Sequence, residues 1–129
     1  MNEKLLKLMR ALDSALFRLE DVLKQPANEY MRDSALQRFE FTFELFWKNL
    51  KGVSDFSGNP VFSPRDALRS AFQLGLIADD PEWFKMLEDR NLTSHAYQEA
   101  IAQLIYSHLP KYLRMMQEVF AELKKRLEP

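Results

Sequence analysis

Cysteine is absent from the 129 residues, which excludes disulfides, thiol nucleophiles and zinc sites with thiolate ligands. The absence also fits a reducing compartment. No apolar run approaches the ~18 residues that a membrane-spanning helix needs, and residues 1–13 carry charges where a signal peptide needs a continuous apolar stretch. We therefore expect a cytoplasmic protein that has no membrane partner.

The net charge is close to zero, and histidine is rare. The formal net charge of -1 lacks the basic excess of a protein that holds nucleic acid by phosphate neutralisation alone, so any RNA contact must be local. His95 and His108 are the only imidazoles, and their spacing matches no recognisable zinc site. We expect no metal and no cofactor, and we interpret His108 as a packed or surface residue.

Apolar material is plentiful by contrast. Hydrophobic residues make up 47% of the chain and ten phenylalanines are among them, which is enough for a packed interior. Strand signals are weak, and the three glycines and most prolines fall between stretches of helical periodicity. The length is that of one domain, so we predict a single all-α domain over residues 1–129.

Apolar spacing and capping residues predict the individual helices. An apolar stripe at three- and four-residue steps predicts the first, start signals at Ser63-Pro64 and Asp80-Pro81 predict the third and fourth, and Gly75 supplies a left-handed stop. Pro110 is expected to kink the last helix. The expected helices cover residues 3–24, 29–51, 64–75, 82–90 and 97–127, with a linker from Gly52 to Phe62.

The second expected helix is apolar on several sides, because Phe41, Leu45 and Trp47 lie off the main stripe of residues 36–50. A helix of this kind is buried on more than one side. This is one reason to expect a homodimer.

Two acidic residues of that helix, Glu40 and Glu44, are four positions apart, where like charges repel by a few tenths of a kcal/mol. One interpretation is that both face water or Lys48. The other is that they receive an arginine from another helix or chain, with Arg90 or Arg38 as the expected partner.

The segment from Glu88 to Tyr97 combines an arginine, an amide, hydroxyls, an imidazole and a phenol at a helix junction. Such clusters commonly provide capping and ion pairs. Histidine can also take a proton from a ribose 2′-hydroxyl, and arginine can hold the phosphate, so Arg90 and His95 could support metal-independent RNA cleavage. On one ideal helix the two residues diverge by about 140°, so either the junction bends or Arg90 meets a histidine of a second chain.

The string Arg90 to Tyr97 has the form R-x4-H-x-Y and resembles the signature of the HEPN superfamily of helical nucleotide-binding and RNase domains. Three further strings resemble the HEPN subgroup called nucleotidyltransferase substrate-binding proteins. They are Gln37–Leu45, Ser63–Asp66 and Leu87–His95.

This resemblance implies a homodimeric four-helix up-and-down bundle with a short accessory helix, working beside a separately encoded minimal nucleotidyltransferase. In the toxin–antitoxin interpretation, Arg90 and His95 form an RNase site across the dimer, and the partner silences it by transferring adenylate from ATP to Tyr97. In the alternative, the chain is a non-catalytic subunit that binds the nucleotide or substrate for its partner. Supporting or binding roles then fall to four residues, Asn91, Ser94, Glu40 and Glu44.

Overall fold

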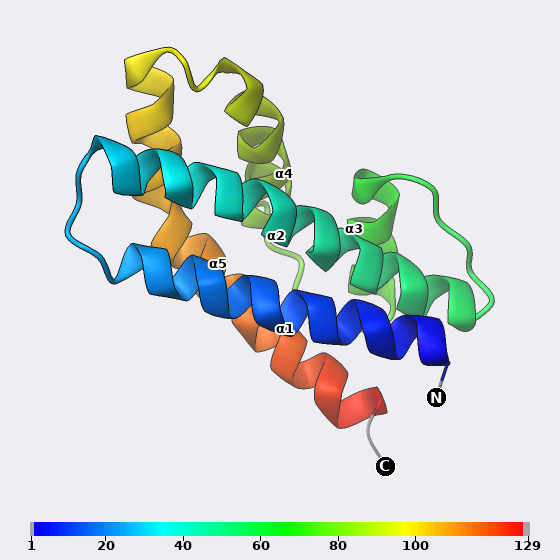
Figure 1. The fold of residues 1–129 in the computed structure, drawn as a ribbon. Helices are drawn as coiled ribbons and strands as arrows, with labels where there is room; N and C mark the ends of the chain where they lie inside the picture. The colour runs from blue at the N-terminus through cyan, green and yellow to red at the C-terminus, as the bar shows by residue number, and fades with distance from the viewer. Residues whose placement is uncertain (1, 128–129) are drawn as a thin grey trace.

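The computed structural model describes residues 2–127, and every regular element in that range is a helix (Figure 1). This confirms the predicted all-α helical bundle. None of the described helices is both long and apolar enough to cross a membrane. The elements are α1 (Glu3–Leu23), α2 (Glu29–Phe56), α3 (Pro64–Gln73), α4 (Glu82–Leu92), the 3-10 turn η1 (Thr93–His95) and α5 (Glu99–Leu127).

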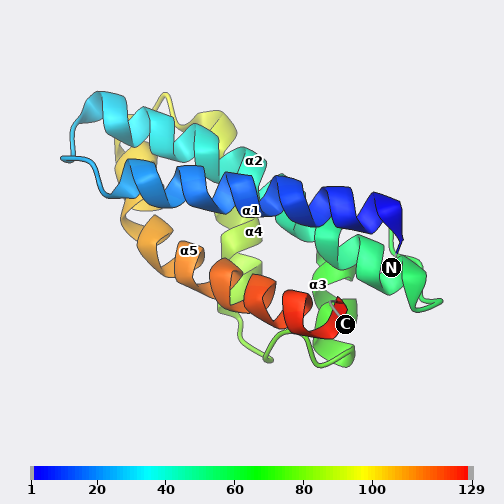
Figure 2. The same ribbon diagram turned by 60° about the horizontal axis from the view of Figure 1, so that its bottom comes forward.

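Helices α1 and α2 form an antiparallel hairpin that lies along one side of the bundle, and α5 packs across both (Figures 1 and 2). The bounds of α1 and the start of α2 agree with the prediction to within a residue. The start of α2 is set by Asn28, whose side chain accepts a hydrogen bond from the backbone N–H of Met31 at 2.9 Å.

The end of α2 was predicted wrongly. The helix continues through Gly52 to Phe56, so the first five residues of the expected linker are helical. Gly52 lies where α1 crosses, and a Cβ atom there would meet Leu5 Cδ1 at 2.9 Å. The glycine is therefore a site of close helix packing, and its missing side chain matters more than its low helix propensity.

The start signals of the two short helices are confirmed. Ser63 Oγ accepts from the backbone N–H of Asp66 at 3.1 Å, and Asp80 Oδ1 accepts from that of Glu82 at 2.9 Å. These caps satisfy N–H groups that have no partner inside the helix.

The stop signal of α3 is confirmed as well. Gly75 has φ 74°, the left-handed conformation expected of it. The guanidinium of Arg126, near the end of α5, donates to the carbonyls of Leu74 at 2.9 Å and of Gly75 at 3.0 Å. The C-terminal turn of α5 thus binds the carbonyl end of α3, which carries partial negative charge.

The core is centred on three fully buried phenylalanines of α2, namely Phe39, Phe43 and Phe46. The Phe39 ring stacks on Tyr112 of α5 with centroids 5.7 Å apart, and the Phe46 ring stacks on Trp83 of α4 at 5.4 Å. Helices α4 and α5 are therefore both held against the same stripe of α2.

Helix α5 begins at Glu99, two residues after the predicted start, and is continuous on both sides of Pro110. Its first turn is tied to α2, because Arg32 Nη1 donates to Glu99 Oε1 at 2.5 Å. Arg32 is buried although Glu99 is exposed. This bond fixes the position of the chain directly after η1.

Replacing Gly75 tests the stop of α3. An alanine there would meet Arg126 only at an ordinary contact distance, so its cost comes from the left-handed backbone and should be about 1–2 kcal/mol of unfolding free energy. Gly75→Asn is the matched control and should lose less, since asparagine tolerates this conformation. Urea unfolding measures both, and equal losses for the two variants would show that backbone strain is not the cause.

Candidate functional site

The junction between α4 and α5 carries most of the predicted site. The backbone stays in right-handed helical geometry from Arg90 through η1 to Ala96, so the chain turns without an extended loop. The Thr93 hydroxyl lies 2.6 Å from both the Arg90 carbonyl oxygen and Glu40 Oε1. Thr93, which the prediction did not single out, therefore joins the junction to α2.

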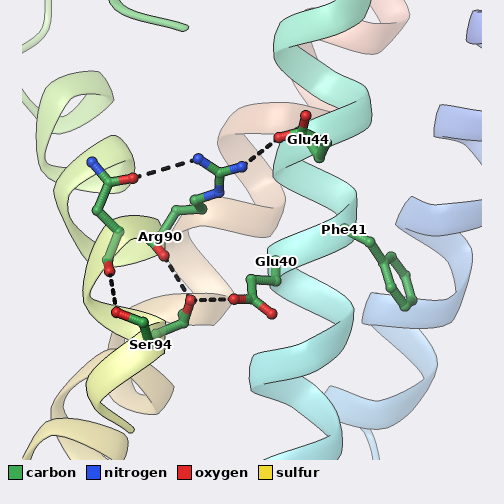
Figure 3. A pocket seen from close by; sticks show the side chains of 7 residues that line it. Glu40, Phe41, Glu44, Arg90 and Ser94 are labelled. Carbon is green, nitrogen blue, oxygen red and sulfur yellow. Dashed lines mark hydrogen bonds and ion pairs between the residues drawn. The ribbon is translucent and has the colours of Figure 1, made fainter.

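Arg90 points from α4 towards α2 and forms a hydrogen-bonded ion pair with Glu44 (Figure 3). The expected pairing of Glu40 or Glu44 with an arginine is thereby confirmed for Glu44 and Arg90. Arg38, the other expected partner, instead donates to the Arg18 carbonyl at 2.7 Å.

Glu44 is surrounded by donors. It accepts from Trp47 Nε1 at 3.0 Å and lies 3.4 Å from Lys48 Nζ, in addition to its bond with Arg90. Partial burial raises the pKa of Glu44, but the Trp47 hydrogen bond and the charges of Arg90 and Lys48 outweigh it. Together they hold the pKa of Glu44 below its ordinary value of 4.5.

An open groove of about 400 Å³ lies between α2 and the end of α4. We call it the Arg90 groove, and Thr93 lies on its wall. Its two carboxylates and one guanidinium give the lining one net negative charge. Five of the predicted site residues line it together with Phe41, namely Glu40, Glu44, Arg90, Asn91 and Ser94.

His95 and Tyr97 lie elsewhere. Tyr97 is 81% exposed and lines an adjoining groove that shares Glu40 and Thr93 with the first. The exposed His95 ring lies 6.2 Å from the Tyr97 ring, and among residues 2–127 it lines neither groove. Within one chain, His95 is therefore not part of the groove that Arg90 lines.

A buried polar cluster directly precedes Arg90, and the sequence did not reveal it. Asp89 is buried, and its Oδ2 accepts from the Tyr112 hydroxyl at 2.5 Å and lies 2.8 Å from His108 Nδ1. Burial and the Asp89 carboxylate raise the pKa of Tyr112. The i,i+4 spacing of His108 and Tyr112 was the available signal. The cluster fixes the rotation of α4 and with it the direction of Arg90.

Comparison with known proteins gives consistent matches. The profile of the family described as "Nucleotidyltransferase substrate binding protein like" matches residues 7–125. A Haemophilus influenzae protein named "Probable ribonuclease HepT" is 27% identical over 135 residues, which covers 92% of each chain.

Two solved structures share the fold. A Thermus thermophilus protein superposes with a TM-score of 0.82 at 36% identity and covers 88% of this chain and 98% of its own. A Haemophilus influenzae protein, described as having the fold of a substrate binding domain of a nucleotidyltransferase, has a TM-score of 0.80 at 26% identity. That match covers 90% of this chain and 98% of the other.

The lowered pKa of Glu44 predicts a pH-dependent stability. A group whose pKa is lower in the folded state stabilises that state above its unfolded pKa, and the stabilisation is lost as pH falls through the folded pKa. Glu44→Gln should therefore lower the urea midpoint at pH 7, and the gap to the wild type should close as the pH falls below about 4.5.

Glu118→Gln is the control, because Glu118 is an exposed carboxylate on α5 outside the Arg90 groove. A gap for Glu44→Gln that stays constant from pH 7 to acid would show that the loss is steric and not electrostatic.

Proposed function

The chain belongs to the family described as nucleotidyltransferase substrate binding protein like, and on that premise we propose that it is the helical partner of a separately encoded minimal nucleotidyltransferase and a ribonuclease controlled by it. The name of the Haemophilus relative supports the ribonuclease part. The observation that carries the proposal is that Arg90 lines an open groove, while His95 is exposed a few residues further along the same helix junction.

The reaction needs only groups that this chain supplies. The His95 imidazole takes the proton of a ribose 2′-hydroxyl, the 2′-oxygen attacks the neighbouring phosphorus, and the bond to the 5′-oxygen breaks. The products are a 2′,3′-cyclic phosphate and a 5′-hydroxyl, whose proton comes from an imidazolium or water. Arg90 exchanges Glu44 for the phosphate and stabilises the charge that develops on the pentacoordinate intermediate.

The site requires a second copy of the chain. His95 does not line the Arg90 groove of its own chain, so in the proposed site the base is the histidine of a twofold-related copy. Exposed apolar side chains of the α1–α2 hairpin, such as Phe17 at 70%, provide surface for contacts between copies.

Tyr97 is the proposed control point. Its exposed phenol can accept adenylate from ATP, with formation of a phenol–phosphate ester and release of pyrophosphate. Tyr97 and Glu40 line the same groove, so the transferred adenylate would add its phosphate to a surface that already carries a carboxylate. The added negative charge and bulk oppose the approach of RNA phosphates.

A second function is favoured by one observation. Arg90 is already paired with Glu44, and its groove carries net negative charge, which disfavours an RNA strand whose phosphate must take Arg90 there. A non-catalytic subunit that binds nucleotide or substrate for the transferase accounts for this pairing without any exchange of partners.

Removal of the proposed general base, His95, tests whether the chain cleaves RNA. His95→Ala should reduce cleavage of total RNA in EDTA by at least the ~10²–10⁴-fold typical of general base catalysis. Cleavage that survives His95→Ala, or none by unmodified wild type on any RNA, would favour the substrate-binding subunit.

Removal of the Tyr97 hydroxyl tests the proposed silencing by the nucleotidyltransferase. Wild type and Tyr97→Phe are first incubated with the nucleotidyltransferase, Mg²⁺ and ATP, and then assayed on RNA in EDTA. Tyr97→Phe should keep its activity while the wild type loses it. Tyr30→Phe is the matched control, because Tyr30 is as exposed as Tyr97, and it should be silenced like the wild type. Silencing of Tyr97→Phe would place the modification elsewhere.

Complementation tests the shared site. Arg90→Ala and His95→Ala should each be inactive, but refolding them together makes mixed dimers with one intact Arg90–His95 pair, which restores about a quarter of wild-type activity. Light scattering should report a dimer at tens of micromolar. A mixture that stays inactive would place both residues in one chain.

A further inference from the structure

The negative lining of the Arg90 groove raises the question of where the chain supplies positive charge to an anionic ligand. The outward face of α2 answers it, because Glu40, Glu44, Lys48 and Lys51 follow one another at helical spacing. The sign of the charge changes along this face. The groove at the acidic end holds Arg90, and a second groove lies at the basic end.

We call this second hollow the lysine groove. It has a volume of about 380 Å³ and lies between α1 and α2, where Gly52 contributes no side chain to its floor. Three ammonium groups and one carboxylate give its lining two net positive charges. The other lining residues are Lys4, Leu8, Trp47, Lys48, Lys51 and Asp55.

Trp47 is the aromatic residue of this lining. The indole is partly buried against the core, and its Nε1 donates to Glu44 at 3.0 Å, so the ring is held in one orientation. A fixed aromatic face beside several lysines is the combination that binds the base and the phosphate of a nucleotide.

Two of the lysines already have partners. Lys48 pairs with Glu44 at 3.4 Å, and Lys51 pairs with Asp55 at 2.9 Å and donates to the Val61 carbonyl at 2.6 Å. Lys51 is therefore part of the local structure, whereas Lys4 and Lys48 are the groups best placed to meet a phosphate.

We propose that the lysine groove binds a nucleotide unit, with its base against Trp47 and Leu8 and its phosphate at Lys4 and Lys48. The unit can be part of an RNA strand or a free nucleoside triphosphate, since both present the same base and phosphate. The proposal deepens the proposed function, on which it rests for the source of the nucleotide.

Glu44 connects the two grooves. It binds Arg90 on one side and Trp47 and Lys48 on the other, so a ligand that draws Lys48 away changes the charge around the Arg90 pair. Along α2, Glu44 and Lys51 are seven residues apart, a rise of ~10 Å, which a short single strand can span.

Tryptophan fluorescence tests the binding directly. The chain has two tryptophans, and Trp83 is buried in the core, so quenching by a stacked base reports on Trp47. The full chain carrying His95→Ala is titrated with ATP, a short single-stranded oligoadenylate, adenosine and inorganic triphosphate. ATP or the oligonucleotide should quench strongly, and adenosine and triphosphate each more weakly.

Lysine variants test the phosphate contacts. Lys4→Gln with Lys48→Gln should weaken binding and reduce the slope of log affinity against log salt by about 0.7 for each lysine removed. Lys24→Gln is the matched control, because Lys24 forms an i,i+4 ion pair with Glu20 outside the groove, and it should bind like the parent chain. Trp47→Ala removes the fluorescent probe, so its binding is measured by the anisotropy of a dye-labelled oligoadenylate, and it should be about tenfold or more weaker than that of the parent chain.

The outcomes distinguish an RNA strand from a free nucleotide as the ligand, and nucleotide binding from ribonuclease activity. Quenching by the oligoadenylate alone identifies an RNA strand as the ligand, and quenching by ATP identifies a free nucleotide. Absence of quenching by both, or a salt slope unchanged by the two lysine substitutions, overturns the proposal. Because binding is measured without turnover, a chain that binds but does not cleave RNA refutes only the ribonuclease.

Discussion

The stacking of Phe39 on Tyr112 and of Phe46 on Trp83 is the constraint on which the rest of the molecule depends. These contacts hold α5 and α4 against the same helix, because one buried stripe of α2 serves both. Glu40 follows Phe39 by one residue, about 100° further round the helix, so it leaves the core and faces the end of α4. The packing that stabilises the bundle therefore also places carboxylates opposite Arg90.

Electrostatics divide the surface of α2 into two parts that share Glu44. Towards α4 the carboxylates exceed the guanidinium, and towards α1 the ammonium groups exceed the carboxylate. Partial burial opposes the ionised form of Glu44, and three donors on different sides overcome it. In the proposed exchange, in which a phosphate takes Arg90, Glu44 keeps the hydrogen bond from Trp47, so its partly buried carboxylate is not left without a donor.

Local sequence rules predicted most of the fold. The predicted caps and the predicted stop form where expected, because each depends only on the nearest few residues. The side chains of Ser63 and Asp80 accept hydrogen bonds at helix starts, and Gly75 adopts the left-handed conformation at a helix end. Helical spacing also indicated that Glu40 and Glu44 needed a cation, and Arg90 provides it.

The rest depends on contacts between distant segments. Local rules predict that Gly52 ends a helix, but the glycine is required by close packing against Leu5 of α1. The hydrogen bonds of Asp89 are likewise made with residues of a different helix, α5. The lysine groove requires Lys4 and Lys51, far apart in the sequence, to line the same hollow.

The arrangement of the two grooves also bears on the proposed control at Tyr97. Under the proposed function, the lysine groove lies on the flank of each Arg90 groove, so a strand would be held more firmly there than at the bond to be cut. In that proposal, a phosphate added at Tyr97 would join a surface whose net charge is already negative, so a single modification would oppose the approach of the strand.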